Sequence, residues 1–194
     1  MRIFVGGAWD PKRAKHFKEE IIELGRLLAV RGHDIILGPG SGVVRYVIDG
    51  FRNVADRKGK IIFYLPKEKE LVRTGEELSP FADEVIRTHD SYLTRVVRMI
   101  EAADGFAAIT GAAGTLYEMI GMMFMKKPVT ILQESGGASN AACFLGGICE
   151  YVKVARTPQE MIDYLENSKI ETNIPEEGID WYDVASPEIK KKDA

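Results

Sequence analysis

A nine-residue segment, Thr110–Glu118 (TGAAGTLYE), combines glycines, a threonine and a carboxylate at spacings that suit two kinds of chemistry. In the first, Thr115 caps the following helix and Glu118, three residues later, bonds back to the cap in a capping box. In the second, Gly111 and Gly114 let the backbone approach an anion, and the N–H groups at a helix N-terminus bind phosphate. A carboxylate beside a phosphate would need a chemical role. The segment alone leaves both interpretations open.

A second glycine-rich segment, GPGSG at 38–42, follows a short apolar run. It matches neither the dinucleotide motif Gly-x-Gly-x-x-Gly, which belongs after the first strand, nor the P-loop with its Lys-Ser/Thr pair. A tight turn between a strand and a helix explains it equally well in isolation. Whether this segment binds a ligand depends on where the fold places it relative to the first segment.

Short apolar runs alternate with amphipathic helical stretches as far as about residue 166. The runs predict strands at 3–7, 34–38, 60–66, 84–88, 105–110, 128–132 and 151–154. The periodicity predicts helices at 12–31, 43–59, 91–103, from Thr115 onward, 140–145 and 158–165. A charged loop fills most of 67–88.

Strands that are apolar on nearly every residue and are joined by helices predict a parallel sheet covered on both faces. We therefore expect a doubly wound, Rossmann-like α/β domain of about seven strands at 1–166, followed by a polar tail at 167–194 with the pair Trp181 and Tyr182. Ligands of such sheets bind beyond the carboxyl ends of the strands, where the strand order reverses.

This rule brings the loops 6–10, 38–42 and 111–115 to one edge of the sheet, so their joint placement favours a phosphate or nucleotide site. The candidate binding residues are Gly7, Gly38, Gly40, Ser41, Gly42, Gly111, Gly114 and Thr115.

Composition excludes several other classes of function. A net charge of -3 and a pI near 5.7 do not suit a general nucleic-acid binder, which needs clustered Lys and Arg. No apolar stretch approaches the roughly 20 residues of a membrane-spanning helix, and the N-terminus does not resemble a signal peptide. Cys143 and Cys149 form no zinc-ligand pattern with the histidines. We expect a cytoplasmic protein without a metal site.

The predicted helix at 91–103 carries Arg95 and Arg98 one turn apart. A water-facing polar stripe is the ordinary explanation for both arginines. However, the stretch RVVRMIEAADGFAAITGAAGTLYE resembles the signature of the LOG proteins, cytokinin riboside 5'-monophosphate phosphoribohydrolases formerly described as lysine decarboxylases. Their pattern is an Arg, a strand, and then Pro-Gly-Gly-x-Gly-Thr-x-x-Glu. GPGSGVV and KPVTIL resemble flanking parts of that family, so the resemblance covers nearly all of the first 166 residues.

This resemblance implies that Arg95 and Glu118 are catalytic and that Gly111, Gly114 and Thr115 bind phosphate. The implied reaction hydrolyses the N-glycosidic bond of a nucleoside 5'-monophosphate to a free base and ribose 5-phosphate. Glu118 would stabilise the positive charge that develops on the sugar, and Arg95 would hold the phosphate or ribose. The implied protein needs no metal or organic cofactor and forms a homodimer or a higher homo-oligomer.

Two departures from the LOG pattern suggest an alternative. Thr110 replaces the proline, and Ala112 and Ala113 replace the second glycine and the variable residue. The threonine at the proline position, together with the first loop GSGVV, looks closer to the molybdenum-cofactor carrier proteins and their uncharacterised relatives, which share the fold but bind rather than hydrolyse. The alternative is therefore a non-catalytic carrier of a nucleotide or of the molybdenum cofactor. The base is not identified, because the loop 67–88, a candidate to contact it, has no recognisable motif.

Overall fold

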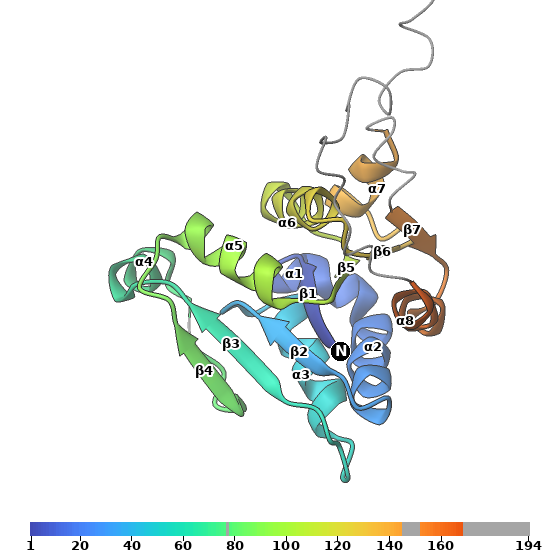
Figure 1. The fold of residues 1–194 in the computed structure, drawn as a ribbon, viewed down its shortest axis with the longest axis horizontal. Coiled ribbons are helices and arrows are strands. Elements are labelled where there is room, and N and C mark those ends of the chain that lie inside the picture. The colour runs from blue at the N-terminus through green and yellow to red at the C-terminus, as the bar shows by residue number, and fades with distance from the viewer. Residues whose placement is uncertain (77, 145–151, 169–194) are drawn as a thin grey trace, which may run out of the picture.

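The structure is a computed structural model that describes residues 1–76, 78–144 and 152–168. It contains one parallel seven-stranded sheet of order β4-β3-β2-β1-β5-β6-β7 (Figure 1). The strands are β1 (Arg2–Gly7), β2 (Asp34–Leu37), β3 (Ile61–Leu65), β4 (Glu84–Arg87), β5 (Gly105–Ile109), β6 (Val129–Leu132) and β7 (Val152–Ala155). The predicted doubly wound α/β fold is confirmed.

Helices cover both faces of the sheet, as Figure 1 shows. On one face lie α2 (Lys18–Val30), α3 (Val43–Arg52) and α8 (Pro158–Asn167). On the other lie α5 (Tyr92–Ala102), α6 (Ala113–Phe124) and α7 (Gly137–Phe144). Two short elements, α1 (Pro11–Ala14) and the 3-10 turn η1 (Lys15–Phe17), precede α2, and α4 (Glu68–Thr74) follows β3.

The strands are apolar on both faces because each face packs against a helical layer. In β1, Ile3 and Val5 join the core beneath α2 and α3, whereas Phe4 joins the core beneath α5 and α6. The Phe4 ring meets the edge of Phe106 from β5 at 4.9 Å between centroids. This central pair fixes β1 beside β5, at the point where the strand order reverses.

Three expected elements differ from those observed. The helix predicted at 12–31 is broken into α1, η1 and α2, and Phe17 at the break has a non-helical backbone. The helix predicted at 43–59 ends at Arg52, because Gly59 lies against the His33 carbonyl and the chain must turn to reach β3. The segment predicted as a charged loop contains the helix α4. The residues on either side of α4 have the composition of turns, so the sequence pattern did not indicate this helix.

Other predictions fall outside the described residues. These include Leu145 at the end of the predicted helix 140–145, Tyr151 at the start of the last predicted strand, Cys149, and the tail residues Trp181 and Tyr182. Within the described ranges, no helix is long and apolar enough to cross a membrane.

Close packing of α2 on α3 sets the position of the loop that precedes α3. A Cβ on Gly25 would overlap the carbonyl of Val47, and a Cβ on Gly50 would overlap the carbonyl of Ile22. The two helix backbones therefore approach each other directly at both glycines. The segment 38–42 is attached to the start of α3, so its place at the sheet edge depends on this contact.

We predict that Gly25→Ala lowers the free energy of unfolding by about 1–3 kcal/mol, since the methyl group must push the helices apart. Gly114→Ala is the matched control, because nothing lies within 4 Å of a Cβ on that helical glycine. Urea unfolding of the two variants measures the difference. Equal midpoints would show that the contact between α2 and α3 yields without cost.

Candidate functional site

A cavity of about 520 Å³ opens at the carboxyl edge of the sheet, where the loops after β1 and β2 face the N-terminus of α6. This is the edge and the switch point that the sequence predicted. Residues from six segments meet in its lining, namely β1 and its loop, the loop after β2, the start of α3, the end of α4 with Glu76 beyond it, α5 and the start of α6. Most of the candidate residues line it, namely Gly7, Gly38, Gly40, Arg95, Gly114, Thr115 and Glu118.

The loops after β1 and β2 are held together by their backbones. The Val43 N–H donates to the carbonyl of Ala8 at 2.9 Å, and the Ser41 hydroxyl donates to the carbonyl of Trp9 at 3.4 Å. Gly42 lies so close to this loop that a Cβ would overlap the Ala8 carbonyl. Ser41 and Gly42, predicted as ligand contacts, therefore connect the two loops and do not line this cavity.

The capping-box interpretation of the segment 110–118 is wrong. Helix α6 begins at Ala113, and its N-cap is Ala112, which provides no side-chain hydrogen bond. Thr115 is already inside the helix, and its hydroxyl donates to the Gly7 carbonyl at 3.3 Å. The first N–H groups of α6 thus have no side-chain cap and lie at the wall of the cavity.

The backbone angles and the space in the turn before α6 determine which residues each of its positions accepts. Gly111 has φ 112°, and a Cβ there would also overlap the side chain of Thr115, so the position requires glycine. Ala112 has the extended φ of -138°, which any residue adopts. The alanine that departs from the LOG pattern therefore leaves the backbone of the turn undisturbed.

Helix α7 holds this turn from outside the cavity. The Ser135 hydroxyl accepts from the Thr110 N–H at 2.8 Å, and the Ser139 hydroxyl donates to the Thr110 carbonyl at 3.1 Å. The Gly111 carbonyl accepts from the Ala138 N–H at 3.0 Å. Because both carbonyls bond towards α7, they do not oppose an anion at the N-terminus of α6. Gly111 shapes the turn and, unlike Gly114, does not line the cavity.

Arg95 is a buried cation in the cavity wall, with only 2% of its surface exposed. Its Nη1 donates to the Tyr64 carbonyl at 3.2 Å, and its guanidinium carbon lies 4.4 Å from the centre of the Tyr92 ring. Its Nε is buried without a hydrogen-bond partner, and Arg95 makes no ion pair within the described part of the chain. Gly38 provides the space, since a Cβ there would overlap Nη1.

Arg98 differs from Arg95 in every respect that matters for a site. Its side chain is 55% exposed and pairs with Asp90 at 3.3 Å and with Glu101 at 3.5 Å. The polar-stripe interpretation therefore holds for Arg98 and is wrong for Arg95.

Glu118 directs its carboxyl group from α6 into the cavity, although the residue as a whole is only partly buried. A Cβ on Gly6 would overlap the Phe106 ring and lie 2.7 Å from Oε2 of Glu118, so glycine there leaves room for both the ring and the carboxylate. Burial raises the pKa of Glu118 to about 8, and the positive charge of Arg95 opposes this shift. Such a carboxyl group exchanges a proton near neutral pH, as acid–base catalysts do.

Two further polar residues of the cavity were missed by sequence reasoning. The Tyr92 hydroxyl donates to Glu76, with both carboxylate oxygens at 3.0 Å. Burial raises the pKa of Glu76, partly offset by the Tyr92 hydrogen bond, and burial raises the pKa of Tyr92 to about 12. Glu76 lies within the predicted charged loop and Tyr92 at a helix start, so neither position carries a motif. Tyr92 lies one helical turn before Arg95 on α5, whereas only the fold brings Glu76 beside them.

No group of three or more His, Cys, Asp or Glu side chains suited to a metal ion occurs among the described residues. The polar groups of the cavity are instead one buried guanidinium, two carboxyl groups of raised pKa and an uncapped helix N-terminus. Helix N-terminal N–H groups and guanidinium groups bind phosphate, and a carboxyl group stabilises positive charge or accepts hydroxyl hydrogens.

Comparison with known proteins shows which proteins this chain resembles. A rice (Oryza sativa subsp. japonica) protein, cytokinin riboside 5'-monophosphate phosphoribohydrolase LOG, is 30% identical over 145 residues, which are 69% of this chain and 54% of that protein. The chain thus matches only about half the length of this curated relative.

Solved structures share the same architecture. The X-ray structure of the protein TM1055 has a TM-score of 0.73 and 25% identity, covering 86% of this chain and 99% of that one. The molybdenum cofactor carrier protein of Chlamydomonas reinhardtii has a TM-score of 0.65 and 20% identity, covering 85% and 95%. At this identity the second likeness concerns the fold alone.

The family model described as the SLOG cluster4 family matches residues 1–162, which include every strand and all lining residues of the cavity. The resemblance to LOG proteins and to molybdenum-cofactor carriers is therefore confirmed at the level of sequence family and fold. The chain belongs to the SLOG cluster4 family.

Proposed function

We propose that this protein hydrolyses the N-glycosidic bond of a nucleoside 5'-monophosphate to a free base and ribose 5-phosphate. The observation that carries the proposal is the meeting of Arg95, Glu118 and the uncapped N-terminus of α6 in one cavity. The similarity to the rice LOG protein supports the same reaction. The cytoplasmic setting expected from the sequence is part of this proposal.

In this reaction the phosphate lies at the N-terminus of α6, where Ala113, Gly114 and Thr115 present N–H groups. Arg95 presents its guanidinium at the cavity wall and contributes positive charge and N–H groups to the phosphate or to a ribose hydroxyl. Binding of the remote phosphate positions the sugar for reaction.

Glu118 then acts on the sugar. As the bond between C1' and the base nitrogen breaks, positive charge spreads over C1' and the ring oxygen, and the Glu118 carboxylate stabilises it. Water adds to C1' and gives a proton to Glu118, the departing base takes up a proton from solvent, and Glu118 then returns its proton to solvent. Burial favours the neutral acid before reaction, and positive charge on the sugar and on Arg95 favours the carboxylate.

The second candidate function is a non-catalytic carrier of a nucleotide or of the molybdenum cofactor. Two observations favour it, namely the replacement of the LOG family's Pro-Gly-Gly by Thr110, Gly111 and Ala112, and the fold shared with the carrier of Chlamydomonas reinhardtii. In a carrier, Glu118 and Arg95 would hold hydroxyl and phosphate groups without bond cleavage.

A panel of nucleoside monophosphates, AMP first, separates the two functions. Chromatography of the reaction mixture detects the free base, and calorimetry measures binding. Release of base supports the hydrolase. Binding of AMP without release of base from any member of the panel would reject the hydrolase in favour of the carrier.

We also propose a homodimer. Large apolar side chains are exposed on α5 and α6, namely Leu93, Val97, Tyr117, Ile120 and Phe124. The two helices contact each other and lie side by side in Figure 1. Apolar patches of this kind commonly mark interfaces between proteins. Light scattering should give twice the chain mass of 21.6 kDa; a monomer mass would show that the patch is not a self-interface.

We predict that Glu118→Gln keeps the fold and the binding of AMP but lowers base release by about 10²–10⁴-fold. The amide has the shape of the protonated acid, so folding loses nothing, but it cannot accept a proton or bear negative charge. In the parent protein, base release should rise as the pH increases towards 8, because the carboxyl group loses its proton over that range. Glu101→Gln, at an exposed site on α5, is the control. Unchanged turnover in Glu118→Gln would remove Glu118 from catalysis.

A second prediction compares the two arginines of α5. Arg95→Met keeps an apolar stem against Tyr92 and loses the charge, so AMP should bind about tenfold or more weakly, as expected for loss of a charge-assisted contact worth about 1.5–3 kcal/mol. Arg98→Met removes only surface ion pairs and should change the dissociation constant less than twofold. Calorimetric titration with AMP measures both. Equal losses would mean that Arg95 does not contact the ligand.

A further inference from the structure

A second cavity, of about 550 Å³, adjoins the first at its open side. Four residues line both cavities, namely Trp9, Gly40, Thr74 and Glu76. Arg95, Glu118 and the N-terminus of α6 line only the first cavity, whereas Arg45, Asp49 and Arg52 of α3 line only the second. The two therefore form one continuous groove with chemically distinct ends.

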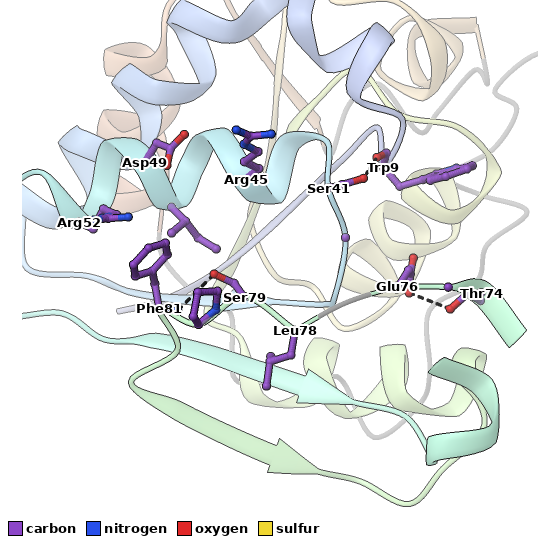
Figure 2. Close-up of a pocket in the computed structure, with 14 residues that line it drawn as sticks. Trp9, Ser41, Arg45, Asp49, Arg52, Thr74, Glu76, Leu78, Ser79 and Phe81 are labelled. Atoms are coloured by element: carbon purple, nitrogen blue, oxygen red, sulfur yellow. Dashed lines mark hydrogen bonds between the residues drawn. The ribbon is translucent and has the colours of Figure 1, made fainter. Parts of the chain in front are cut away.

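The walls of the second cavity come from α3 and from the segment of residues 74–76 and 78–81, at and after the end of α4, and Figure 2 shows these on opposite sides of it. Ile48 of α3 and Leu78, Pro80 and Phe81 of the segment contribute apolar surface. The guanidinium of Arg52 lies 3.6 Å from the centre of the Phe81 ring and fixes α3 to the segment. The second cavity is thus a partly apolar slot between two connected walls.

Trp9 stands at the junction of the two cavities. Its side chain reaches outward from the loop after β1, with 68% of the residue exposed, and Figure 2 shows it across the opening from Glu76 and Thr74. Its backbone is held by the Ser41 hydroxyl at 3.4 Å. Across the junction, Glu76 is held by the Tyr92 hydroxyl. The exposed ring of Trp9 thus stands across the junction from the Glu76 carboxyl group, where a ligand would pass from one cavity to the other.

We propose that the second cavity is the subsite for a planar aromatic heterocycle, with Trp9 as its stacking surface, for a ligand whose phosphate lies at the N-terminus of α6. This inference rests on the proposed phosphate site and names the part of the ligand that the sequence left open. Stacking suits Trp9 because every heterocyclic base has a π-face. Glu76 accepts a hydrogen bond from an amino or ring N–H group of the heterocycle.

The two ends of the groove can be tested separately with AMP and ribose 5-phosphate, which differ by the base. Binding is measured by calorimetry in the Glu118→Gln background, where AMP is not consumed. Trp9→Ala should weaken AMP binding about tenfold or more and change ribose 5-phosphate binding less than twofold. Trp9→Phe keeps an aromatic face and should restore most of the affinity for AMP. Ser79→Phe, which fills only the second cavity, should weaken AMP alone.

A spectroscopic measurement checks the contact itself. The chain has two tryptophans, so Trp181→Phe leaves Trp9 as the only one. AMP should quench the fluorescence of Trp9, whereas ribose 5-phosphate should bind without quenching. Equal loss of both ligands in Trp9→Ala, or no quenching by bound AMP, would overturn the base subsite while leaving the phosphate site intact. Failure of both ligands to bind the parent protein would overturn the phosphate site and the subsite together.

Discussion

The site depends on a buried positive charge that the protein does not neutralise. Burying a charged group without a partner costs several kcal/mol, and Arg95 has one backbone hydrogen bond and the face of Tyr92 to offset that cost. One donor, Nε, is left unsatisfied. Because the guanidinium lies in the cavity wall, folding leaves a favourable charge interaction to be made by an anionic ligand bound in the cavity.

The positive charge of Arg95 also affects the pKa of Glu118 and of Glu76. Arg95 lowers the pKa of each carboxyl group while burial raises it, and burial is the larger effect in both. Glycine makes this arrangement possible, because Gly38 admits the guanidinium and Gly6 admits the Glu118 carboxyl group. Side chains at either glycine would fill the space that the charged groups occupy. The lack of a Cβ atom at Gly6 and at Gly38 therefore leaves the space that the two charged groups occupy at this edge of the sheet.

The fold and half of the site were predictable because their signals are local. Alternating apolar runs and helical periods indicate the sheet, and the spacing of Gly114, Thr115 and Glu118 marks the start of α6. The cap assignment of Thr115 failed because α6 begins two residues earlier, at Ala113, and the hydroxyl bonds to Gly7 across the sheet.

The remaining site residues depend on contacts between segments far apart in the chain. Tyr92 and Glu76 are 16 residues apart, and only the return of the chain from α4 through β4 to α5 joins them. Trp9 meets Glu76 at the groove because the loops after β1 and β2 are bonded to each other. Arg95 is buried and Arg98 is exposed because they occupy different angular positions on α5 relative to β3. Helical spacing in the sequence does not show which of the two positions faces the sheet.

The most direct test is titration of the Glu118 carboxyl group by carbon-13 NMR, in the parent protein and in Arg95→Met. Burial raises the pKa of Glu118 and Arg95 lowers it, so the carboxyl group of the parent protein should titrate near pH 8. Loss of the guanidinium should move the titration midpoint to a higher pH. A midpoint near 4.5 that does not respond to Arg95→Met would contradict the coupled, buried pair on which the proposed site is based.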